Sequence, residues 1–380
     1  MKIVMIVDSL KVGGREKVVF NLSNKLSESN EVHIVTLSNN HNELESTLKP
    51  GVKVHALPFA YEDLGGLHAP VFWLNGIGKL SRLLKQLNAD IIHTHLLFQR
   101  FLFATIAVKR SGVKARLYQT VHTLGLYYSG MGFRNGIRLM TEKTAFKIYP
   151  VHLITVSDEV KKICEKHFHK AKEIRTIFNG VDANIFDYQL KSVIRKEYFG
   201  FTNGDIIITC LARMDAGKDH LTLLRAFKKI IAANQHAKLC LAGDGEEKAK
   251  LQSYVNREGL AQNVHFLNTV YEPEKLLAIT DIAVSCSLFE GFSLGLIEQM
   301  IMKVPVVVTN IPSFSSVIEN GQNGFLFSPG NEDELAAHLI NLINNRSLRI
   351  ETATKAYDSA LKFSADNMAR LHLDYYNLHA

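Results

Sequence analysis

The fold is decided by the stretch Asp281-Ile-Ala-Val-Ser-Cys-Ser-Leu-Phe-Glu290-Gly-Phe-Ser-Leu-Gly-Leu-Ile-Glu298-Gln-Met300. It begins with a short apolar run that predicts a buried strand at Ile282–Ser285. A turn with glycines then leads into a helical pattern, and a second apolar run at Val304–Thr309 predicts the next strand. The order strand, turn, helix, strand is typical of an α/β fold with a parallel sheet.

The turn and the first helical residues of this stretch form a candidate ligand site. Gly291 and Gly295 let the backbone approach a ligand closely, and Ser293 is placed to cap the helix. The free N–H groups of the first turn would favour an anion, above all a phosphate. Glu290 and Glu298 bracket this position. Because carboxylates repel phosphate, we expect them to hold hydroxyl groups, and a ligand with central phosphates and hydroxyls at both ends is a nucleotide sugar.

The rest of the chain repeats the alternation of strands and helices. Helical patterns such as Glu16–Leu26 and Gly78–Leu87 separate short apolar runs. These runs predict strands at Lys2–Val7, Val32–Thr36, Val52–His55, Ile91–His93, Leu117–Thr120, Leu153–Val156, Ile206–Leu211, Lys238–Ala242, Val264–Leu267 and Gly324–Phe327. A length of 380 residues suits two α/β domains. Such sheets bind ligands at the carboxyl ends of their strands, so we expect the functional loops there.

Composition and charge narrow the class of protein. Hydrophobic residues make up 47% and charged residues 21%, as in soluble globular proteins. No apolar stretch approaches the roughly 20 residues needed to cross a bilayer, and the apolar run at residues 2–7 is too short for a signal peptide. The four cysteines, at positions 164, 210, 240 and 286, lack zinc spacing and suit buried apolar positions. The expected location is cytoplasmic, with a peripheral position on the inner face of the membrane as an alternative.

The net charge of +7 is concentrated in the first half. Residues 1–180 hold 25 basic and 14 acidic side chains, and Arg100–Lys147 alone holds nine basic residues and one acid. A solvated basic face, a nucleic-acid site and contact with an anionic membrane all agree with this pattern. In the segment 126–149, Phe133, Ile137, Met140 and Ile148 fall near one helical face beside basic residues. This pattern fits either a helix resting on a membrane or a surface helix packed on its own sheet.

Two further motifs follow predicted strands. Gly13-Gly14 opens a helix, where a glycine backbone and a helix N-terminus suit a phosphate. It lacks the glycine patterns of dehydrogenases and P-loop enzymes, and an ordinary tight turn is the alternative. Arg213 and Lys218 lie five residues apart in one loop, so the two cations can converge on a diphosphate. A solvated charged loop is the alternative there.

These motifs, taken in order, resemble a known family. Glu290 and Glu298, with seven residues between them, are similar to the E-x7-E motif of retaining enzymes in glycosyltransferase family 4. The resemblance implies the GT-B fold, in which two Rossmann-like domains face each other across a cleft. It also implies that a C-terminal helix crosses back to the N-terminal domain. We expect an acceptor-binding domain at residues 1–183 with 362–380, and a donor-binding domain at residues 184–361.

The resemblance assigns roles to the loops of both domains. Gly13 and Gly14 would face the donor diphosphate, and His122, which follows a predicted strand, would lie near the donor sugar. A core or surface histidine is the alternative for His122. Arg213 and Lys218 would offset the negative charge that grows on the leaving nucleoside diphosphate.

Within the donor-binding domain, the resemblance also places Gly243 near the base and ribose, with a plain turn as the alternative. Glu298 would hold the ribose hydroxyls, and Glu290 would hold sugar hydroxyls. The remaining donor contacts would come from the backbone of Gly291, Phe292, Ser293, Leu294 and Gly295.

The sequence departs from the family in two places. Asp219 stands where glycine usually follows the lysine, and Ser316 stands where a glutamate is common. The chain has no Asp-x-Asp, the metal-binding pattern of other glycosyltransferases. His93-Thr-His95 has the spacing of a ligand pair but lacks an evident third partner. We therefore expect no metal and no cofactor.

The predicted function is sugar transfer from a nucleoside-diphosphate sugar, with UDP as the expected nucleotide. The acceptor would be a glycan, a lipid-linked glycan or a small molecule. Three alternatives remain: a sugar-nucleotide epimerase or phosphorylase of the same fold, a non-catalytic module that binds sugar nucleotides or a membrane surface, and a nucleic-acid binder. The last leaves Glu290 and Glu298 without a role, so nucleic acid is not an expected partner.

Overall fold

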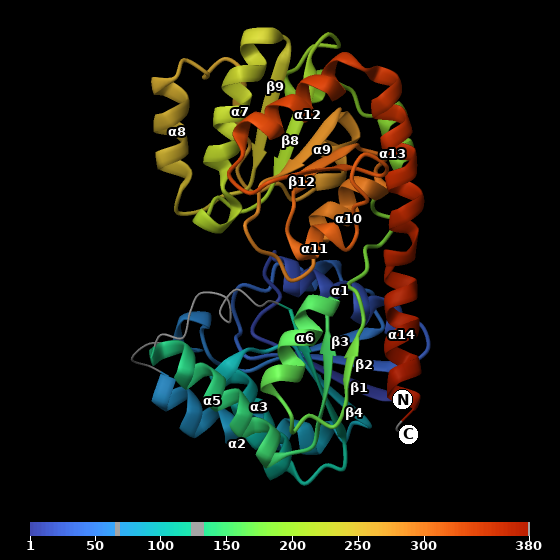
Figure 1. Ribbon diagram of the computed structural model, residues 1–380. Coiled ribbons are helices and arrows are strands. Elements are labelled where there is room, and N and C mark those ends of the chain that lie inside the picture. Colours follow the sequence, from blue (N-terminus) through green and yellow to red (C-terminus); the bar gives the residue numbers. More distant parts are fainter. Residues whose placement is uncertain (65–68, 123–132, 379–380) are drawn as a thin grey trace. The chain divides into compact units, whose positions relative to one another are not determined.

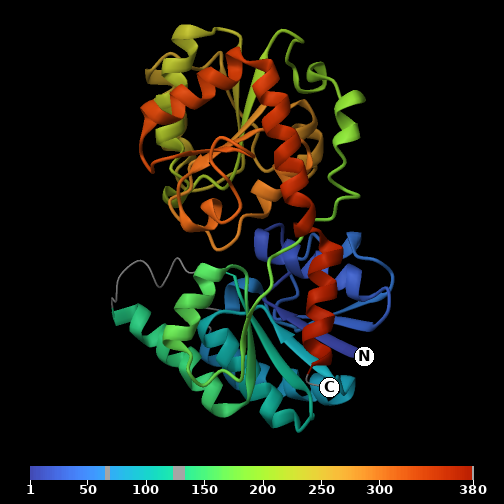
Figure 2. The same ribbon diagram turned by 45° about the vertical axis from the view of Figure 1, so that its right-hand side comes forward.

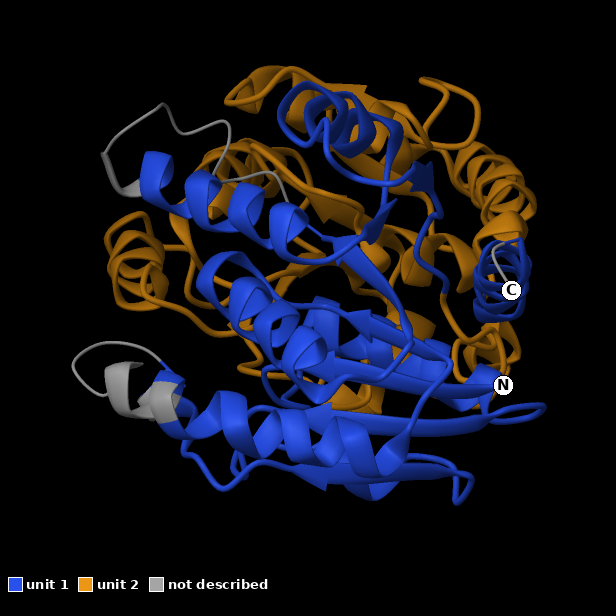
Figure 3. Ribbon diagram, turned by 90° about the horizontal axis from the view of Figure 1, so that it is seen from below, with its two compact units in different colours: residues 1–180, 365–380 blue, residues 181–364 orange. Residues whose placement is uncertain are grey.

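The computed structural model describes residues 1–64, 69–122 and 133–378 and divides into two compact units (Figures 1 and 3). Unit 1 is Met1–Gly180 with Ala365–Ala380, and unit 2 is Val181–Ser364. Both ends of the chain therefore belong to unit 1, as the colours in Figure 3 show. The predicted domains end at residues 183 and 361, a few residues from these limits. Part of the predicted amphipathic segment, residues 126–132, lies outside the described residues.

Unit 1 is built on a parallel sheet of seven strands in the order β3-β2-β1-β4-β5-β6-β7. The bounds are β1 (Lys2–Val7), β2 (Glu31–Thr36), β3 (Val52–Ala56), β4 (Ile91–Thr94), β5 (Arg116–Val121), β6 (Val151–Thr155) and β7 (Ile174–Thr176). The helices are α1 (Gly14–Leu26), α2 (Ala69–Leu87), α3 (Phe98–Ser111), α5 (Phe133–Ile148), α6 (Asp158–His167) and α14 (Ala365–Asn377).

Unit 2 repeats this plan with a parallel sheet of six strands in the order β10-β9-β8-β11-β12-β13. Its strands are β8 (Ile206–Leu211), β9 (Ala237–Ala242), β10 (Val264–Phe266), β11 (Ile282–Ser285), β12 (Val306–Thr309) and β13 (Phe325–Phe327). Its helices are α7 (His220–Ala233), α8 (Lys248–Arg257), α9 (Pro273–Ile279), α10 (Leu294–Ile301), α11 (Pro312–Ser315), α12 (Glu332–Asn344) and α13 (Arg346–Ala360).

The predicted α/β fold class is confirmed, and every predicted strand is present with its ends shifted by at most two residues. The sequence analysis missed β7, which has three residues, none of them fully buried. Burial explains why the other strands have clear apolar runs in the sequence. In β8, Ile208 and Cys210 join the apolar core on one face of the sheet, and Ile207 joins the core on the other. A strand covered on both faces is apolar at nearly every position.

The C-terminal helix α14 returns to unit 1, as predicted (Figures 1 and 2). Lys25 Nζ in α1 lies 2.8 Å from the Asp366 carboxylate, and the Arg116 guanidinium donates to the carbonyl of Tyr376 at 2.9 Å. Tyr375 and Tyr376 are fully buried. The helix is thus part of the unit 1 core, although residues 181–364 separate it from the rest of that unit.

Candidate active site

The predicted donor loops of unit 2 follow three neighbouring strands. β8 pairs with β9 on one side and with β11 on the other, and all three run parallel. Their carboxyl ends therefore share one edge of the sheet. The loop with Arg213 and Lys218, the loop with Gly243 and the turn with Glu290 all leave from this edge.

The turn after β11 presents a capped helix N-terminus. Ser293 caps α10, because its hydroxyl accepts a hydrogen bond from the backbone N–H of Leu296 at 3.2 Å. Phe292 is buried with its ring centroid 5.3 Å from that of Phe363, which fixes the start of the helix. A side chain at Gly295 would come within 3.8 Å of the Leu211 carbonyl, so the first turn of α10 lies close to the end of β8. The predicted cap is confirmed.

Lys218 and Glu290 form an ion pair at this edge of the sheet. The Ser287 hydroxyl donates to the same carboxylate oxygen at 2.9 Å. The backbone of Leu288 also donates to the carbonyl of Gly217 at 2.8 Å, which ties the two loops together. Both charged side chains keep about a fifth of their surface exposed. Each is therefore accessible to a ligand that could replace its partner in the ion pair. The sequence analysis gave these residues separate roles and missed their contact.

Asp219 explains how the loop tolerates the loss of the usual glycine. Its φ of 43° lies in the left-handed region, which glycine adopts without strain. Its carboxylate also accepts hydrogen bonds from the N–H and hydroxyl of Thr222, at 3.4 and 2.7 Å, and so caps α7. The cap offsets the backbone strain, and the loop keeps a conformation that suits glycine.

Arg213 does not join Lys218 in this structure. Its side chain is 78% exposed, and its guanidinium lies 3.1 Å from the Asp215 carboxylate. The predicted convergence of the two cations on one ligand stays a prediction.

Two glycines in the loop after β9 press against the loop that carries Arg213. Gly243 has a φ of 146°, and a Cβ there would lie 2.1 Å from the carbonyl oxygen of Ala212. A Cβ at Gly245 would lie 2.3 Å from the carbonyl oxygen of Met214. Both positions therefore need glycine for packing, which explains this motif without a ligand.

Glu298 is in the second turn of α10 and only 4% exposed. It lies on the same helix that Ser293 caps, five residues after the cap. Its predicted role with ribose hydroxyls stays a prediction.

In unit 1, the predicted glycines open α1 after β1. A Cβ at Gly13 would lie 2.4 Å from the Glu16 carboxylate, whereas a Cβ at Gly14 would meet no atom within 4 Å. Gly13 is thus explained by packing, and Gly14 leaves open space beside the start of the helix.

Charged residues on both sides of this turn form a network that was not predicted from the sequence. The Arg15 guanidinium is 3.0 Å from Asp8 and 2.8 Å from Glu16, and Arg100 is 2.7 Å from the same oxygen of Asp8. Burial opposes the charge of Arg15, but the two carboxylates outweigh it and raise the pKa of Arg15. The network ties together Asp8 and Arg15, which flank the Gly13-Gly14 turn.

His122 follows β5 and contacts a second histidine. Its Nε2 lies 2.9 Å from Nδ1 of His95, which follows the neighbouring strand β4. His95 is fully buried, and its ring centroid lies 4.2 Å from that of His93, with the two rings tilted by 35°. Burial, followed by the neighbouring histidines and Arg15, holds the pKa values of His95 and His122 well below the ordinary value. His122 is therefore neutral at pH 7, and its predicted position near a sugar stays a prediction.

The described residues hold no cluster of metal ligands. Across residues 1–64, 69–122 and 133–378, no three His, Cys, Asp or Glu side chains gather as a metal site would require. Both ring nitrogens of His93 are instead hydrogen-bonded, Nδ1 to the Tyr376 hydroxyl at 2.6 Å and Nε2 to the Thr120 hydroxyl at 2.7 Å.

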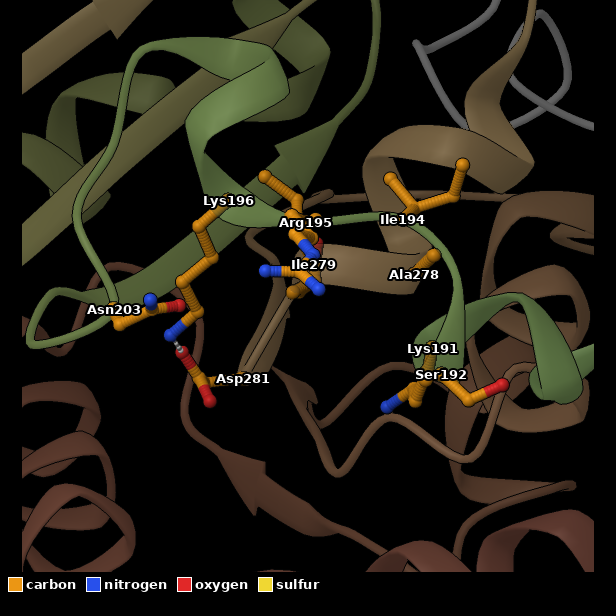
Figure 4. A pocket seen from close by; sticks show the side chains of 10 residues that line it. Lys191, Ser192, Ile194, Arg195, Lys196, Asn203, Ala278, Ile279 and Asp281 are labelled. Carbon is orange, nitrogen blue, oxygen red and sulfur yellow. Dashed lines mark hydrogen bonds and ion pairs between the residues drawn. The ribbon is translucent and has the colours of Figure 1, made fainter.

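A pocket of about 370 Å³ lies elsewhere in unit 2 (Figure 4). It includes Asp281, which precedes β11, so it lies at the amino edge of the sheet rather than at the carboxyl edge. Lys196 donates to the Asp281 carboxylate at 2.7 Å, and Lys191 donates to the Lys303 carbonyl at 2.9 Å. These lysines tether the segment before β8 to its own unit and give the pocket a structural explanation.

Comparison with known proteins identifies the family. A model described as "Glycosyltransferase Family 4" matches residues 12–185, and one described as "Glycosyl transferases group 1" matches residues 194–359. The chain belongs to glycosyltransferase family 4 and has the GT-B fold. It is an enzyme of the glycosyltransferase class.

Relatives cover nearly all of this glycosyltransferase. The N-acetyl-alpha-D-glucosaminyl L-malate synthase of Bacillus anthracis is 26% identical over 92% of this chain and 89% of its own. An N-acetylgalactosaminyltransferase of Campylobacter jejuni that acts on a diphospho-undecaprenol-linked sugar is 26% identical over 98% of this chain and 99% of its own. The crystal structure of Anabaena HepE with UDP and glucose has a TM-score of 0.82, 20% identity and 99% coverage of both chains.

Proposed function

We propose that this glycosyltransferase is a retaining, metal-independent enzyme that uses a UDP-sugar donor. The observation that carries the proposal is the Lys218–Glu290 ion pair beside the capped N-terminus of α10. It combines a cation, a carboxylate and free backbone N–H groups at the carboxyl edge of one sheet. These are the groups that a diphosphate flanked by hydroxyl-bearing sugars requires.

Donor binding would divide the ion pair. Lys218 turns to the diphosphate, and Glu290 is released to accept hydrogen bonds from sugar hydroxyls. Glu298 accepts hydrogen bonds from the ribose hydroxyls, and the N–H groups around Leu294 and Gly295 donate to phosphate oxygens. Negative charge grows on the diphosphate as the glycosidic bond breaks, so a fixed cation stabilises the transition state more than the ground state.

The chemical step is the attack of an acceptor hydroxyl on the anomeric carbon, on the face that the leaving group occupies. The departing phosphate oxygen takes the proton of that hydroxyl. No side chain then has to act as a nucleophile, and the anomeric configuration of the donor is kept.

The names of related proteins support the choice of UDP and of the acceptor class. HepE was crystallised with UDP, and an Escherichia coli relative, 27% identical over 71% of this chain and 70% of its own, is named as a UDP-Gal galactosyltransferase acting on a diphospho-undecaprenol-linked sugar. We infer a glycan, lipid-linked or small-molecule hydroxyl as the acceptor.

A thermal-shift panel of UDP, GDP, ADP and their common sugar conjugates tests the donor site, run with EDTA and again with Mg²⁺. A ligand at 100 times its Kd stabilises the folded protein by about 2.7 kcal/mol. We expect UDP compounds to raise the melting temperature equally in both conditions. A shift that needs Mg²⁺ would contradict metal independence, and a shift with GDP alone would contradict the choice of base.

The configuration of the product separates retention from inversion, and proton NMR of the first-formed glycoside measures it. The same assay addresses the alternatives of similar fold. Donor turnover without transfer would favour an epimerase or phosphorylase, and UDP-sugar binding without turnover would favour a binding module.

A peripheral contact with an anionic membrane is a second proposal, carried by α5. Ile137 and Met140 are 39% and 64% exposed, and Lys143 and Lys147 are exposed one and two turns further along the helix. An exposed row of apolar and basic side chains suits a surface of anionic lipid. Flotation with phosphatidylglycerol vesicles at low salt tests this. Met140→Ser with Ile137→Ser should abolish co-flotation, and absence of co-flotation by the wild type would contradict the proposal.

A further inference from the structure

Four imidazoles, three of them buried and that of His122 partly exposed, line one face of the unit 1 sheet. His93 and His95 share a face because they lie two residues apart along β4 and its extension. His122 joins them from the end of β5, and His372 joins from α14. Neighbouring ring centroids are 5.6 Å apart for His372 and His93, 4.2 Å for His93 and His95, and 5.2 Å for His95 and His122.

These rings are neutral at pH 7. Burial lowers the pKa of His372 to about 4 and holds those of His93, His95 and His122 well below the ordinary value. The nearby positive group is Arg15, which also opposes protonation of His95 and His122. A neutral imidazole carries one hydrogen, so each ring has one donor nitrogen and one acceptor nitrogen.

The contact between His95 and His122 therefore has two possible arrangements. In the first, Nδ1–H of His95 donates to Nε2 of His122. In the second, Nε2–H of His122 donates to Nδ1 of His95, and the hydrogen of His95 must then lie on its Nε2. That second nitrogen of His95 is buried and has no hydrogen-bond partner among the residues described.

The unpartnered nitrogen decides between the two arrangements. The second leaves a buried N–H group without an acceptor, a rare state in native proteins. The first leaves only a lone pair without a partner, at a buried nitrogen. His95 therefore carries its hydrogen on Nδ1, and His122 must accept at Nε2 and carry its own hydrogen on Nδ1.

We propose that His95 is a positioning residue that fixes His122 as a hydrogen-bond donor through Nδ1–H. This rests on the proposed function and on the prediction, from the family resemblance, that His122 lies near the donor sugar. In this tautomer, His122 donates to a hydroxyl oxygen of the donor or the acceptor. Its Nε2 lone pair is already used by His95, so His122 does not serve as a general base.

The surroundings of His95 are built to hold this orientation. Its backbone N–H donates to the Ile6 carbonyl at 2.8 Å, which extends β4 by one residue along β1. His93, whose ring lies against it, is itself held by Tyr376 and Thr120 at its two nitrogens. The ring of His95 is thus fixed before any ligand binds, and its Nδ1 is directed at Nε2 of His122.

The tautomers can be measured directly in the full-length wild-type protein. Two-bond proton–nitrogen correlation spectra of protein labelled with ¹⁵N-histidine distinguish Nδ1–H from Nε2–H. The signals that are lost in the His122→Gln variant identify His122 among the sixteen histidines. We expect His122 to be protonated at Nδ1 and bare at Nε2. A proton on Nε2 of His122 would overturn the proposal. This readout needs no turnover, so it stands even if the proposed donor is wrong.

Two variants test the dependence on His95. His95→Phe keeps an aromatic ring for stacking but removes the donor, and His95→Gln keeps an amide N–H. We expect His95→Phe to release the fixed tautomer of His122 and to lower kcat about fivefold to tenfold, the value of one neutral hydrogen bond. His95→Gln should restore most of this loss. An unchanged His122 tautomer or an unchanged kcat in His95→Phe would each overturn the proposal.

The same sheet offers a matched control. Nδ1 of His33 and Nε2 of His55 also lie 2.9 Å apart, with ring centroids at 5.1 Å, but this pair joins β2 and β3. His33→Phe should leave the His122 tautomer unchanged and kcat within about twofold of wild type. An equal loss of kcat in both variants would mean that His95 acts only through the stability of the sheet, which also overturns the proposal.

Discussion

The two units arrange their candidate site residues by different physical means. In unit 2, the ends of β8, β9 and β11 bring together a helix N-terminus, an ion pair and loops that are closely packed at glycines. In unit 1, a row of neutral histidine rings lies near Arg15, which belongs to a cluster of charged residues. The first arrangement is suited to holding charge and changing partners, and the second to holding neutral groups in fixed orientations. Substitutions in the two units should therefore change different properties of the enzyme.

The largest effect is expected from Lys218. Lys218→Ala removes the cation placed for the diphosphate and should lower kcat roughly 100-fold to 1,000-fold, as for the loss of one transition-state charge contact. Steady-state kinetics with the donor found by the thermal-shift panel measure this. Lys228 is the control, because it forms an exposed ion pair with Glu258 at 2.8 Å on the same unit. Lys228→Ala should keep kcat within about twofold, and a similar loss in both variants would contradict the role of Lys218.

Lowering the pH should reduce the free energy of unfolding through the buried histidines of unit 1, but not through exposed histidines. The folded-state pKa of His372 is about 4, below the unfolded value of about 6.5. As the pH falls below 6.5, the unfolded chain binds a proton that the folded protein does not. Stability is therefore full above pH 6.5 and is lost towards pH 4, by about 1.4 kcal/mol per pH unit for one such group.

Urea unfolding at pH 7.5, 6.5, 5.5 and 4.5 measures this slope. His372→Phe should reduce the slope between pH 6.5 and 4.5, because one buried histidine is gone. The exposed His236 is the control position, and His236→Phe should leave the slope of the wild type. If His372→Phe and wild type lose stability in parallel, the imidazole cluster is not the source of the acid sensitivity.

Glu298 should affect binding rather than chemistry. Glu298→Gln replaces a buried carboxylate by an amide of similar size, so the ribose loses a charged hydrogen-bond acceptor. We expect the donor KM to rise about tenfold or more, with kcat changed only slightly. Initial rates over a range of donor concentrations test the division, with Glu258→Gln as the control. A loss confined to kcat would show that Glu298 acts in the transition state and not on the ribose.

The comparison of the units also shows what the sequence alone could predict. The candidate site of unit 2 is encoded within one strand, one turn and one helix, so Ser293, Gly295 and Glu298 could be found from local patterns. The strands could be found because burial on both faces makes each run apolar. The contact between Lys218 and Glu290 could not, since 72 positions separate them and only the pairing of β8 with β11 unites their loops.

Unit 1 depends still more on distant pairings. His95 contacts His122 across 27 positions, and His93 contacts Tyr376 across 283 positions. The spacing of His93 and His95 is that of a pair of metal ligands, but their partners come from another strand and from the last helix. The ring cluster was therefore not predicted from the sequence. The short strand β7 was missed because incomplete burial left it without an apolar run.

The smallest predicted effect separates the backbone strain at Asp219 from its capping role. Asp219→Ala keeps the left-handed backbone but loses the cap of α7, and should lower the free energy of unfolding by about 1–2 kcal/mol. Asp219→Gly loses the same cap but removes the strain, so its effect should stay within about 0.5 kcal/mol. Urea unfolding of both variants at pH 7.5 measures the difference. Equal losses in the two variants would mean that the cap alone matters, and that the loop beside Lys218 carries no backbone strain for a glycine to relieve.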